Sequence, residues 1–123
     1  MKPGKTGVAR ILAASGYSWK GIKAAYRHEP AFRQEVLLTV IGVPLAIWLA
    51  QSTIQLLLLI LPLFLLLLVE LANSAIEAVV DRIGDEMHEL SGRAKDMGSA
   101  MVMLALVMLG FSWIMILGDN YVW

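Results

Sequence analysis

The 123-residue sequence contains no cysteine and little charge, and both shortages limit what the chain can be. Without cysteine, neither a disulfide framework nor a thiolate metal site can form, and the redox environment cannot be read from the residues. Charged residues make up 16% of the chain and their signs cancel, whereas 59% of the residues are hydrophobic. The mean hydropathy is +0.71. Because a soluble domain of this length could not bury so much apolar surface, the sequence predicts a membrane protein.

The loops of the common nucleotide-binding folds are missing as well. The sequence has no Walker A loop, no G-x-G-x-x-G loop and no protein-kinase catalytic loop. Any nucleotide would therefore have to bind through a different architecture. The N-terminal segment is short and basic but leads into a mixed polar stretch without an apolar core, so we expect no removable signal peptide.

Three apolar stretches, residues 36–50, 56–80 and 97–117, are predicted to cross the membrane as helices. Residues 56–69 form an unbroken apolar run, which lacks the alternation of a barrel strand and favours an all-α fold. Residues 81–96 would form a cytoplasmic loop with the adjoining helix ends, in which Ser91-Gly92 ends one helix and Arg93 starts the next. The prediction is one domain over residues 1–123.

The segment before the first span, residues 8–35, has apolar residues at helical spacing, and its basic residues mostly avoid that stripe. This pattern predicts an amphipathic helix on the cytoplasmic membrane surface, which Gly16 and Gly21 could break. Pro30 is expected to start a second short helix, residues 30–35, that leads into the membrane.

Charge placement predicts the orientation. Every basic residue lies before the first span or between the second and third spans. By the positive-inside rule, the N-terminus is expected to be cytoplasmic and the C-terminus to lie on the outer side.

A polar ladder follows the longest apolar run. Glu70 comes after fourteen apolar residues, and Asn73, Glu77 and Asp81 continue from it at helical spacing on one face. A carboxylate inside a span is costly and usually functional. The alternative is that Glu70 is a protonated residue in helix packing and that Asp81 belongs to a solvated face.

Such a ladder could support phosphoryl transfer, which needs a divalent cation on hard oxygen ligands, a base and positive charge near the phosphates. Glu70 could be the base, and Glu77 with Glu29 or Glu35 could hold the metal. The candidate phosphate partners are Arg10, Lys20, Lys23, Arg93 and Lys95. The same set of acidic and basic residues would fit a subunit of a proton-coupled transporter or a lipid-binding scaffold.

Four strings then point to a family: residues 15–21 (SGYSWKG), 31–35 (AFRQE), 70–84 (ELANSAIEAVVDRIG) and 88–99 (HELSGRAKDMGS). Together they closely resemble prokaryotic diacylglycerol kinase. The E-x-x-N-[ST]-A-I-E core with a following A-K-D is highly specific, and motif-level likeness covers roughly half of the chain. The uncharged connection between the first two spans, residues 50–55, departs from the acidic residues and arginine expected in the family.

The resemblance implies an ATP-dependent kinase that phosphorylates 1,2-diacylglycerol to phosphatidate in the bacterial inner membrane. It implies a homotrimer with shared active sites, Mg²⁺ as cofactor, ATP as co-substrate and no nucleic-acid partner. The resemblance also implies that Glu70 is the general base with Asn73 beside it, and that Glu29 and Glu77 bind magnesium. The nucleotide would contact Arg10, Tyr17, Glu29, Glu77, Glu86, His88, Lys95 and Asp96. The lipid would contact Arg10, Ala14, Ser15, Gly16, Tyr17, Ser18, Trp19, Lys23, Ala24, Ala25, Tyr26, Ala31, Phe32, Arg33, Gln34, Glu35, Trp48, Glu70 and Ser99.

Two rival interpretations remain at this point. Gram-positive relatives of the same fold phosphorylate undecaprenol, and only likeness of sequence separates the two substrates, since each presents one primary hydroxyl. A small membrane protein that binds lipid or relays protons through Glu70 without catalysis is the second rival.

Overall fold

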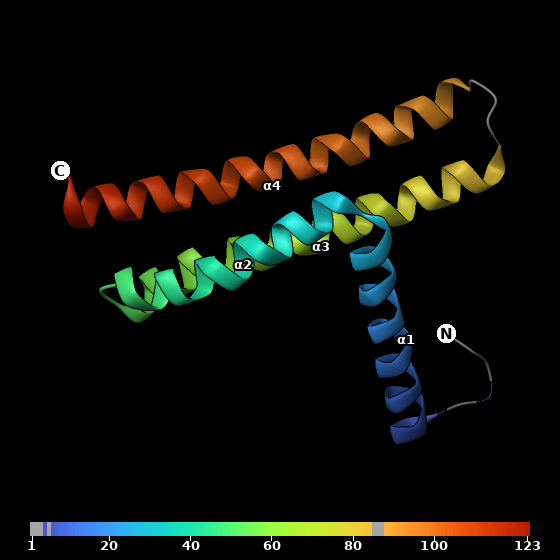
Figure 1. Ribbon diagram of the computed structural model, residues 1–123, viewed down its shortest axis with the longest axis horizontal. Helices are drawn as coiled ribbons and strands as arrows, with labels where there is room; N and C mark the ends of the chain where they lie inside the picture. The colour runs from blue at the N-terminus through green and yellow to red at the C-terminus, as the bar shows by residue number, and fades with distance from the viewer. Residues whose placement is uncertain (1–3, 5, 85–87) are drawn as a thin grey trace.

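The computed structural model describes residue 4, residues 6–84 and residues 88–123, and these residues form four α-helices. They are α1 (Gly7–His28), α2 (Pro30–Leu49), α3 (Thr53–Ile83) and α4 (Glu89–Tyr121). α2, α3 and α4 pack along one another in alternating directions, while α1 projects across their common axis (Figure 1). The last three helices are each long and apolar enough to cross a membrane, which confirms the predicted all-α fold with three membrane helices.

Pro30 sets the corner between α1 and α2. A proline disfavours the helical conformation of the preceding residue, and Glu29 is accordingly extended, with φ −117° and ψ 101°. Pro30 occupies the start of α2, where its missing N–H removes no helical hydrogen bond. The Arg33 guanidinium reaches back and donates to the carbonyl oxygens of Tyr26 and Arg27, at 2.8 and 3.1 Å. These bonds satisfy carbonyls that the end of α1 leaves free.

Two predicted helix breaks are wrong. α1 continues through Gly16 and Gly21, and residues 30–35 are the first turns of α2 rather than a separate helix. A glycine inside a helix costs only about 1 kcal/mol, which is too little to end a helix that has no other stop signal. The break between α1 and α2 falls at Glu29, which confirms the helix start predicted at Pro30, because a proline disfavours the helical conformation of the residue before it.

The start of α4 also differs from the prediction. The helix begins at Glu89 and passes through Ser91 and Gly92 instead of starting after them. His88 provides the start signal, because its Nδ1 accepts a hydrogen bond from the Leu90 backbone N–H at 3.0 Å. This bond satisfies one of the free donors at the helix N-terminus.

One face of α3 forms the centre of the bundle. Leu59, Leu63 and Leu66 are its most buried side chains and recur at helical spacing. Glu70 and Asn73 continue the same face and are buried as well. The buried face of a single helix therefore changes from leucine to polar residues at the level where α1 meets the bundle.

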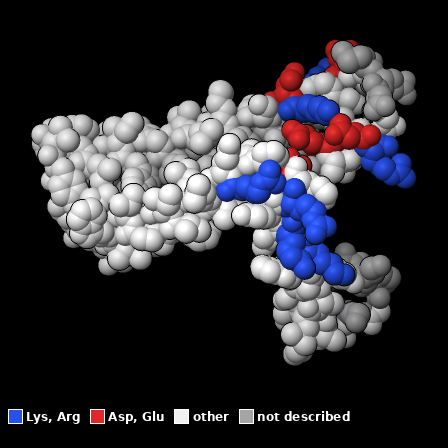
Figure 2. Space-filling view, viewed as in Figure 1, with Lys and Arg blue, Asp and Glu red and all other residues white. Residues whose placement is uncertain are grey.

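Charge gathers at one end of the molecule. Figure 2 shows the lysines, arginines, aspartates and glutamates along α1, at the α1–α2 corner and on the ends of α3 and α4 near it. Within α2, α3 and α4, the outward side chains beyond this end are largely exposed aliphatic and aromatic residues. Such faces are stable against lipid hydrocarbon, so the polar part of α3 lies at the boundary between the apolar bundle and its charged end.

Candidate active site at the polar end of the bundle

A cavity of about 380 Å³ opens where the corner before α2 meets α3 and α4. Glu29 enters from the corner, Glu70, Asn73 and Glu77 enter from successive turns of α3, and Ser99 enters from α4. Pro30, Ala31, Val102, Met103 and Leu106 complete the wall. The structure thus brings together, in one chain, the residues predicted as base, base partner and metal ligands.

Burial decreases along the polar face of α3. Glu70 is 5% exposed and Asn73 is 9% exposed, whereas Glu77 is partly exposed and Asp81 is exposed. The Asn73 carboxamide donates through Nδ2 to Glu77 Oε1 at 3.4 Å. Because a carboxylate only accepts hydrogen bonds, the amide nitrogen of Asn73 faces Glu77, and the Asn73 oxygen points away from Glu77. The four residues of the polar ladder therefore share one face of α3, and a hydrogen bond links Asn73 to Glu77.

Glu35 of α2 faces Glu70 of α3. It is 9% exposed, and its carboxyl group lies close enough to the Glu70 carboxyl group for the two to interact. Glu35 is thereby a partner of the predicted base, a contact that sequence spacing could not reveal because it joins two helices.

The two predicted metal ligands fit Mg²⁺ in a restricted way. Glu29 and Glu77 line the same cavity and offer the hard oxygen donors that Mg²⁺ prefers. Among the described residues, no cluster of three or more histidine, cysteine, aspartate or glutamate side chains could enclose a metal ion. Magnesium at phosphoryl-transfer sites usually has one or two protein carboxylates, with water and phosphate oxygens completing the shell, and two glutamates meet that requirement.

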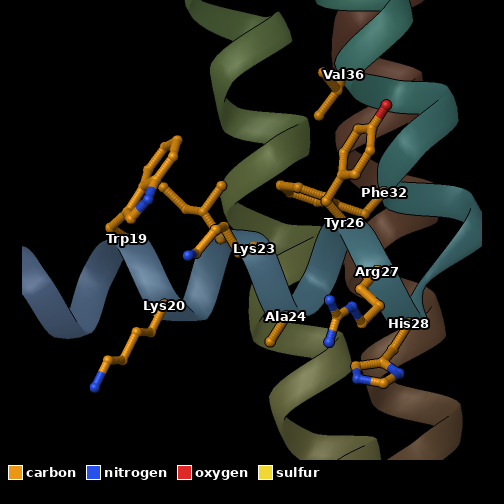
Figure 3. Close-up of a pocket in the computed structure, with 10 residues that line it drawn as sticks. Trp19, Lys20, Lys23, Ala24, Tyr26, Arg27, His28, Phe32 and Val36 are labelled. Atoms are coloured by element: carbon orange, nitrogen blue, oxygen red, sulfur yellow. The ribbon is translucent and has the colours of Figure 1, made fainter.

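A second cavity, of about 630 Å³, lies between α1 and the start of α2. In Figure 3, the Trp19, Tyr26 and Phe32 side chains extend toward Val36 and the bundle, while Lys20, Arg27 and His28 lie toward the opposite side of α1. Apolar and aromatic groups on one side with cations on the other suit a site at a membrane interface. Lys23 and Ala24, both predicted to contact lipid, also line this cavity.

The remaining predicted lipid contacts lie mostly along α1. Arg10, Ala14, Ser15 and Ser18 line a shallow hollow on this helix, and Ala25 is buried. The Ser15 and Ser18 hydroxyls donate to carbonyl oxygens one turn earlier, at 3.0 and 2.9 Å. Gly16 is exposed on α1, Gln34 is exposed on α2, and Arg33 caps α1. Trp48, 79% exposed, is at the opposite end of α2 from the corner.

Several predicted nucleotide contacts are not brought to the Glu70 cavity by a single chain. Arg10 and Tyr17 are exposed on α1, and Lys95 and Asp96 are exposed on α4, outside the lining of that cavity. Lys95 Nζ instead pairs with Asp81 Oδ1 at 2.8 Å across α3 and α4. His88 is exposed and caps α4. Glu86 lies outside the described residues.

Sequence reasoning missed some residues that line the cavities. Val102 and Leu106 lie three and seven positions after Ser99, so helical spacing from Ser99 would have found both. His28 and Val36 line the second cavity but carried no signal, because they come together only through the corner at Glu29.

Fold and site together define a small integral membrane protein with a buried carboxylate and carboxamide at its polar end, beside an amphipathic helix. Residues 16–117 match the model of the prokaryotic diacylglycerol kinase family. The diacylglycerol kinase of Escherichia coli strain K12 is 52% identical over 116 residues, covering 94% of this chain and 95% of that protein. Those of Pseudomonas aeruginosa and Haemophilus influenzae are 52% and 47% identical, covering 93% and 88% of this chain, and 93% and 92% of those proteins.

The chain belongs to the prokaryotic diacylglycerol kinase family, since both the family match and the relatives cover most of its length. It is accordingly a membrane enzyme of the kinase class. The resemblance inferred from the four sequence strings is confirmed.

Proposed function

We propose that this protein transfers the γ-phosphoryl group of ATP to the primary hydroxyl of 1,2-diacylglycerol and releases phosphatidate into the membrane. The observation that carries the proposal is the cavity in which Glu70, Asn73, Glu77 and Glu29 meet. It lies beside an apolar bundle from which a lipid can enter and a charged end from which a nucleotide can enter. The relatives named as diacylglycerol kinases support the choice of lipid.

Glu70 is the general base in this mechanism. Its carboxylate accepts the proton of the lipid hydroxyl, the hydroxyl oxygen forms a bond to the γ-phosphorus, and the bond from that phosphorus to the bridging oxygen of ADP breaks. Asn73 borders the reacting groups and holds Glu77 through its carboxamide. Glu70 is largely buried at the cavity wall, and catalysis of phosphoryl transfer rests mainly on positioning and electrostatic stabilisation.

Glu29 and Glu77 are the proposed ligands of magnesium. These two carboxylates would hold Mg²⁺ beside the nucleotide, where the ion would supply positive charge that offsets the negative charge of the phosphates. The nucleotide would also contact Arg10, Tyr17, Glu86, His88, Lys95 and Asp96. In this state the ion pair between Lys95 and Asp81 would break, and Lys95 would pair with a phosphate oxygen instead. The lipid would lie between α1 and α2, where aromatic and basic residues line the second cavity.

We further propose a homotrimer in which neighbouring chains share each active site. Arg10 precedes His28 by eighteen residues of a continuous helix, which separates them by roughly 27 Å along its axis. α1 points away from its own bundle (Figure 1). An arginine side chain cannot span that distance, so Arg10 can contact a nucleotide at the Glu70 cavity only in another chain.

The proposed setting is the bacterial inner membrane, with a cytoplasmic N-terminus and a periplasmic C-terminus. The gathering of charged residues at one end of the molecule supports this orientation, because basic residues favour the cytoplasmic side (Figure 2). ATP then enters from the side on which the cell keeps it.

The experiment that tests the function is phosphate transfer from labelled ATP in mixed micelles with Mg²⁺. Diacylglycerol and undecaprenol are offered separately to the parent protein and to Glu70→Gln. We expect transfer to diacylglycerol, with a loss of at least about a hundredfold in the variant, which is the usual contribution of a general base. Removal of the metal with a chelator should abolish the transfer.

Glu89→Gln is the matched control. This glutamate is exposed at the start of α4 and pairs with Arg93 on the surface, so the same substitution there should leave transfer unchanged. Transfer to undecaprenol alone would reassign the substrate. A folded parent protein that transfers no phosphate would overturn the proposed function.

A further inference from the structure

Gly98 of α4 lies directly against the carboxamide of Asn73. Gly98 is buried, and a β-carbon at this position would overlap Asn73 Oδ1 and crowd the rest of the side chain. Helices in membranes approach closely where small residues face the partner helix. Here the space left by the missing side chain is filled by one polar group, Asn73.

The Asn73 carboxamide lies between Glu77 on one side and Gly98 on the other. Its nitrogen donates to Glu77 Oε1 at 3.4 Å, while its oxygen is buried without a hydrogen-bond partner. The hydrogen bond to Glu77 is already long, so a small displacement of the carboxamide would break it. The contact with Gly98 therefore keeps the Asn73 carboxamide within hydrogen-bonding distance of Glu77.

We propose that Gly98 is a positioning residue, whose lack of a side chain sets the Asn73 carboxamide and, through it, the orientation of Glu77 toward the metal. This inference rests on the proposed function for the role of Glu77, but not for the contact between Gly98 and Asn73. Partners that hydrogen-bond to a metal ligand typically change metal affinity by about 10-fold to 100-fold when they are lost. We expect Gly98→Ala to fall in that range.

The contact can be tested without metal or substrate. Asn73 and Asn120 are the only two asparagines of the chain, so selective ¹⁵N-asparagine labelling gives two pairs of side-chain amide signals. Asn73→Ala assigns them. Gly98→Ala should shift the Asn73 signals and leave those of Asn120 unchanged, because Asn120 is near the other end of α4.

The second readout is direct binding of Mn²⁺ with a non-hydrolysable ATP analogue, followed by electron paramagnetic resonance. Gly98→Ala should weaken Mn²⁺ binding at least about tenfold. The matched control is Gly110→Ala in the same helix, where an added β-carbon meets no atom within 4 Å. It should alter neither the asparagine signals nor Mn²⁺ binding.

Unchanged Asn73 signals in Gly98→Ala would overturn the proposal, as would shifted signals with unchanged Mn²⁺ affinity. If Gly98→Ala does not fold, the double variant Asn73→Ser with Gly98→Ala tests the contact instead. Serine at position 73 is shorter than asparagine and removes the overlap with the new β-carbon. Folding of the pair supports the contact, and failure of the pair to fold contradicts it. A parent protein that binds no Mn²⁺ would refute the proposed function, while the asparagine spectra would still test the contact.

Discussion

At the scale of single residues, some polar side-chain atoms of the helix bundle have a hydrogen-bond partner and others have none. Trp113 Nε1 donates to the Leu59 carbonyl oxygen at 3.0 Å, and the Tyr121 hydroxyl donates to the Leu49 carbonyl oxygen at 2.8 Å. Within the described ranges, the buried side-chain oxygens without a partner are Glu35 Oε2, Asn73 Oδ1 and Ser74 Oγ.

These three atoms belong to the polar end of the bundle, where Asn73 lines the Glu70 cavity and Glu35 faces Glu70. Ser74 lines an adjoining cavity beside Glu29. An unpaired buried polar atom costs free energy, and a ligand or a catalytic role is one of the reasons for which such atoms persist. Their position supports the assignment of the active site to this end.

The opposite end of the bundle contains a reciprocal pair of carboxamides. Gln55 Nε2 donates to Asn120 Oδ1 at 2.9 Å, and Asn120 Nδ2 donates to Gln55 Oε1 at 2.8 Å. We predict that Asn120→Leu lowers the free energy of unfolding by about 1 kcal/mol, because the Gln55 carboxamide loses both of its bonds to Asn120 in a partly buried site. Unfolding by heat or by denaturing detergent in micelles measures the change.

The variant with both Gln55→Leu and Asn120→Leu should lose less stability than the two single variants added together, since neither amide is then left unpaired. Gln51→Leu is the matched control, because this side chain is exposed and only the Gln51 backbone bonds to Gln55. Additive losses would show that the pair contributes nothing beyond its separate side chains.

At the scale of helices, Arg33 controls how α1 meets the bundle. Its guanidinium donates to two carbonyl oxygens in the last turn of α1. We predict that Arg33→Ala raises hydrogen exchange in the last turns of α1 about tenfold, because hydrogen bonds from charged groups contribute roughly 1.5 kcal/mol. Mass spectrometry of exchange in micelles measures this.

Arg33→Lys should restore only part of the protection, since an ammonium group lacks the fork that reaches two acceptors. Lys20→Ala removes a cation from the side of α1 opposite Val36 and should leave exchange in the last turns unchanged (Figure 3). Equal exchange in Arg33→Ala and the parent protein would contradict the capping role.

The elements differ in how far the sequence predicts them. Long apolar runs predict the three membrane helices, and the polar ladder from Glu70 to Asp81 is visible from helical spacing alone. The helix ends are harder, because a glycine such as Gly92 changes the free energy by only about 1 kcal/mol. The cap that starts α4 is a single bond from Leu90 to His88, which no pattern of hydrophobicity contains.

The site is predictable where its residues share one helix and not where helices meet. Helical spacing places Glu70, Asn73 and Glu77 on one face of α3. The approach of Gly98 to Asn73 and of Glu35 to Glu70 depends on how α2 and α4 pack against α3. Packing between helices is decided by side chains far apart in sequence, so local patterns do not contain it.

At the scale of the whole molecule, one chain supplies only part of the proposed nucleotide site. Glu29 and Glu77 meet in one cavity, but α1 extends away from the bundle that contains this cavity (Figure 1). A ring of three chains would let α1 of one chain reach the cavity of the next, as a closed cyclic assembly requires of its interfaces. The open side of the cavity and the outward direction of α1 then have one explanation.

Mixing of two defective variants tests this arrangement. Glu70→Gln and Arg10→Ala should each have little activity alone. If Glu70 and Arg10 of one site come from different chains, an equal random mixture should recover about one quarter of the parent activity, since each residue is intact half of the time. The mixture is made by unfolding the two proteins together and refolding them in micelles before phosphate transfer is assayed.

A mixture of Glu70→Gln with Asn73→Ala serves as the control, because both residues lie on the same face of α3 and line the same cavity of one chain. This mixture should stay inactive. Recovery in the control would mean that the cavity itself is assembled from two chains. Failure of the Glu70→Gln and Arg10→Ala mixture to recover would mean that Arg10 serves its own chain, which requires α1 to bend between Arg10 and His28.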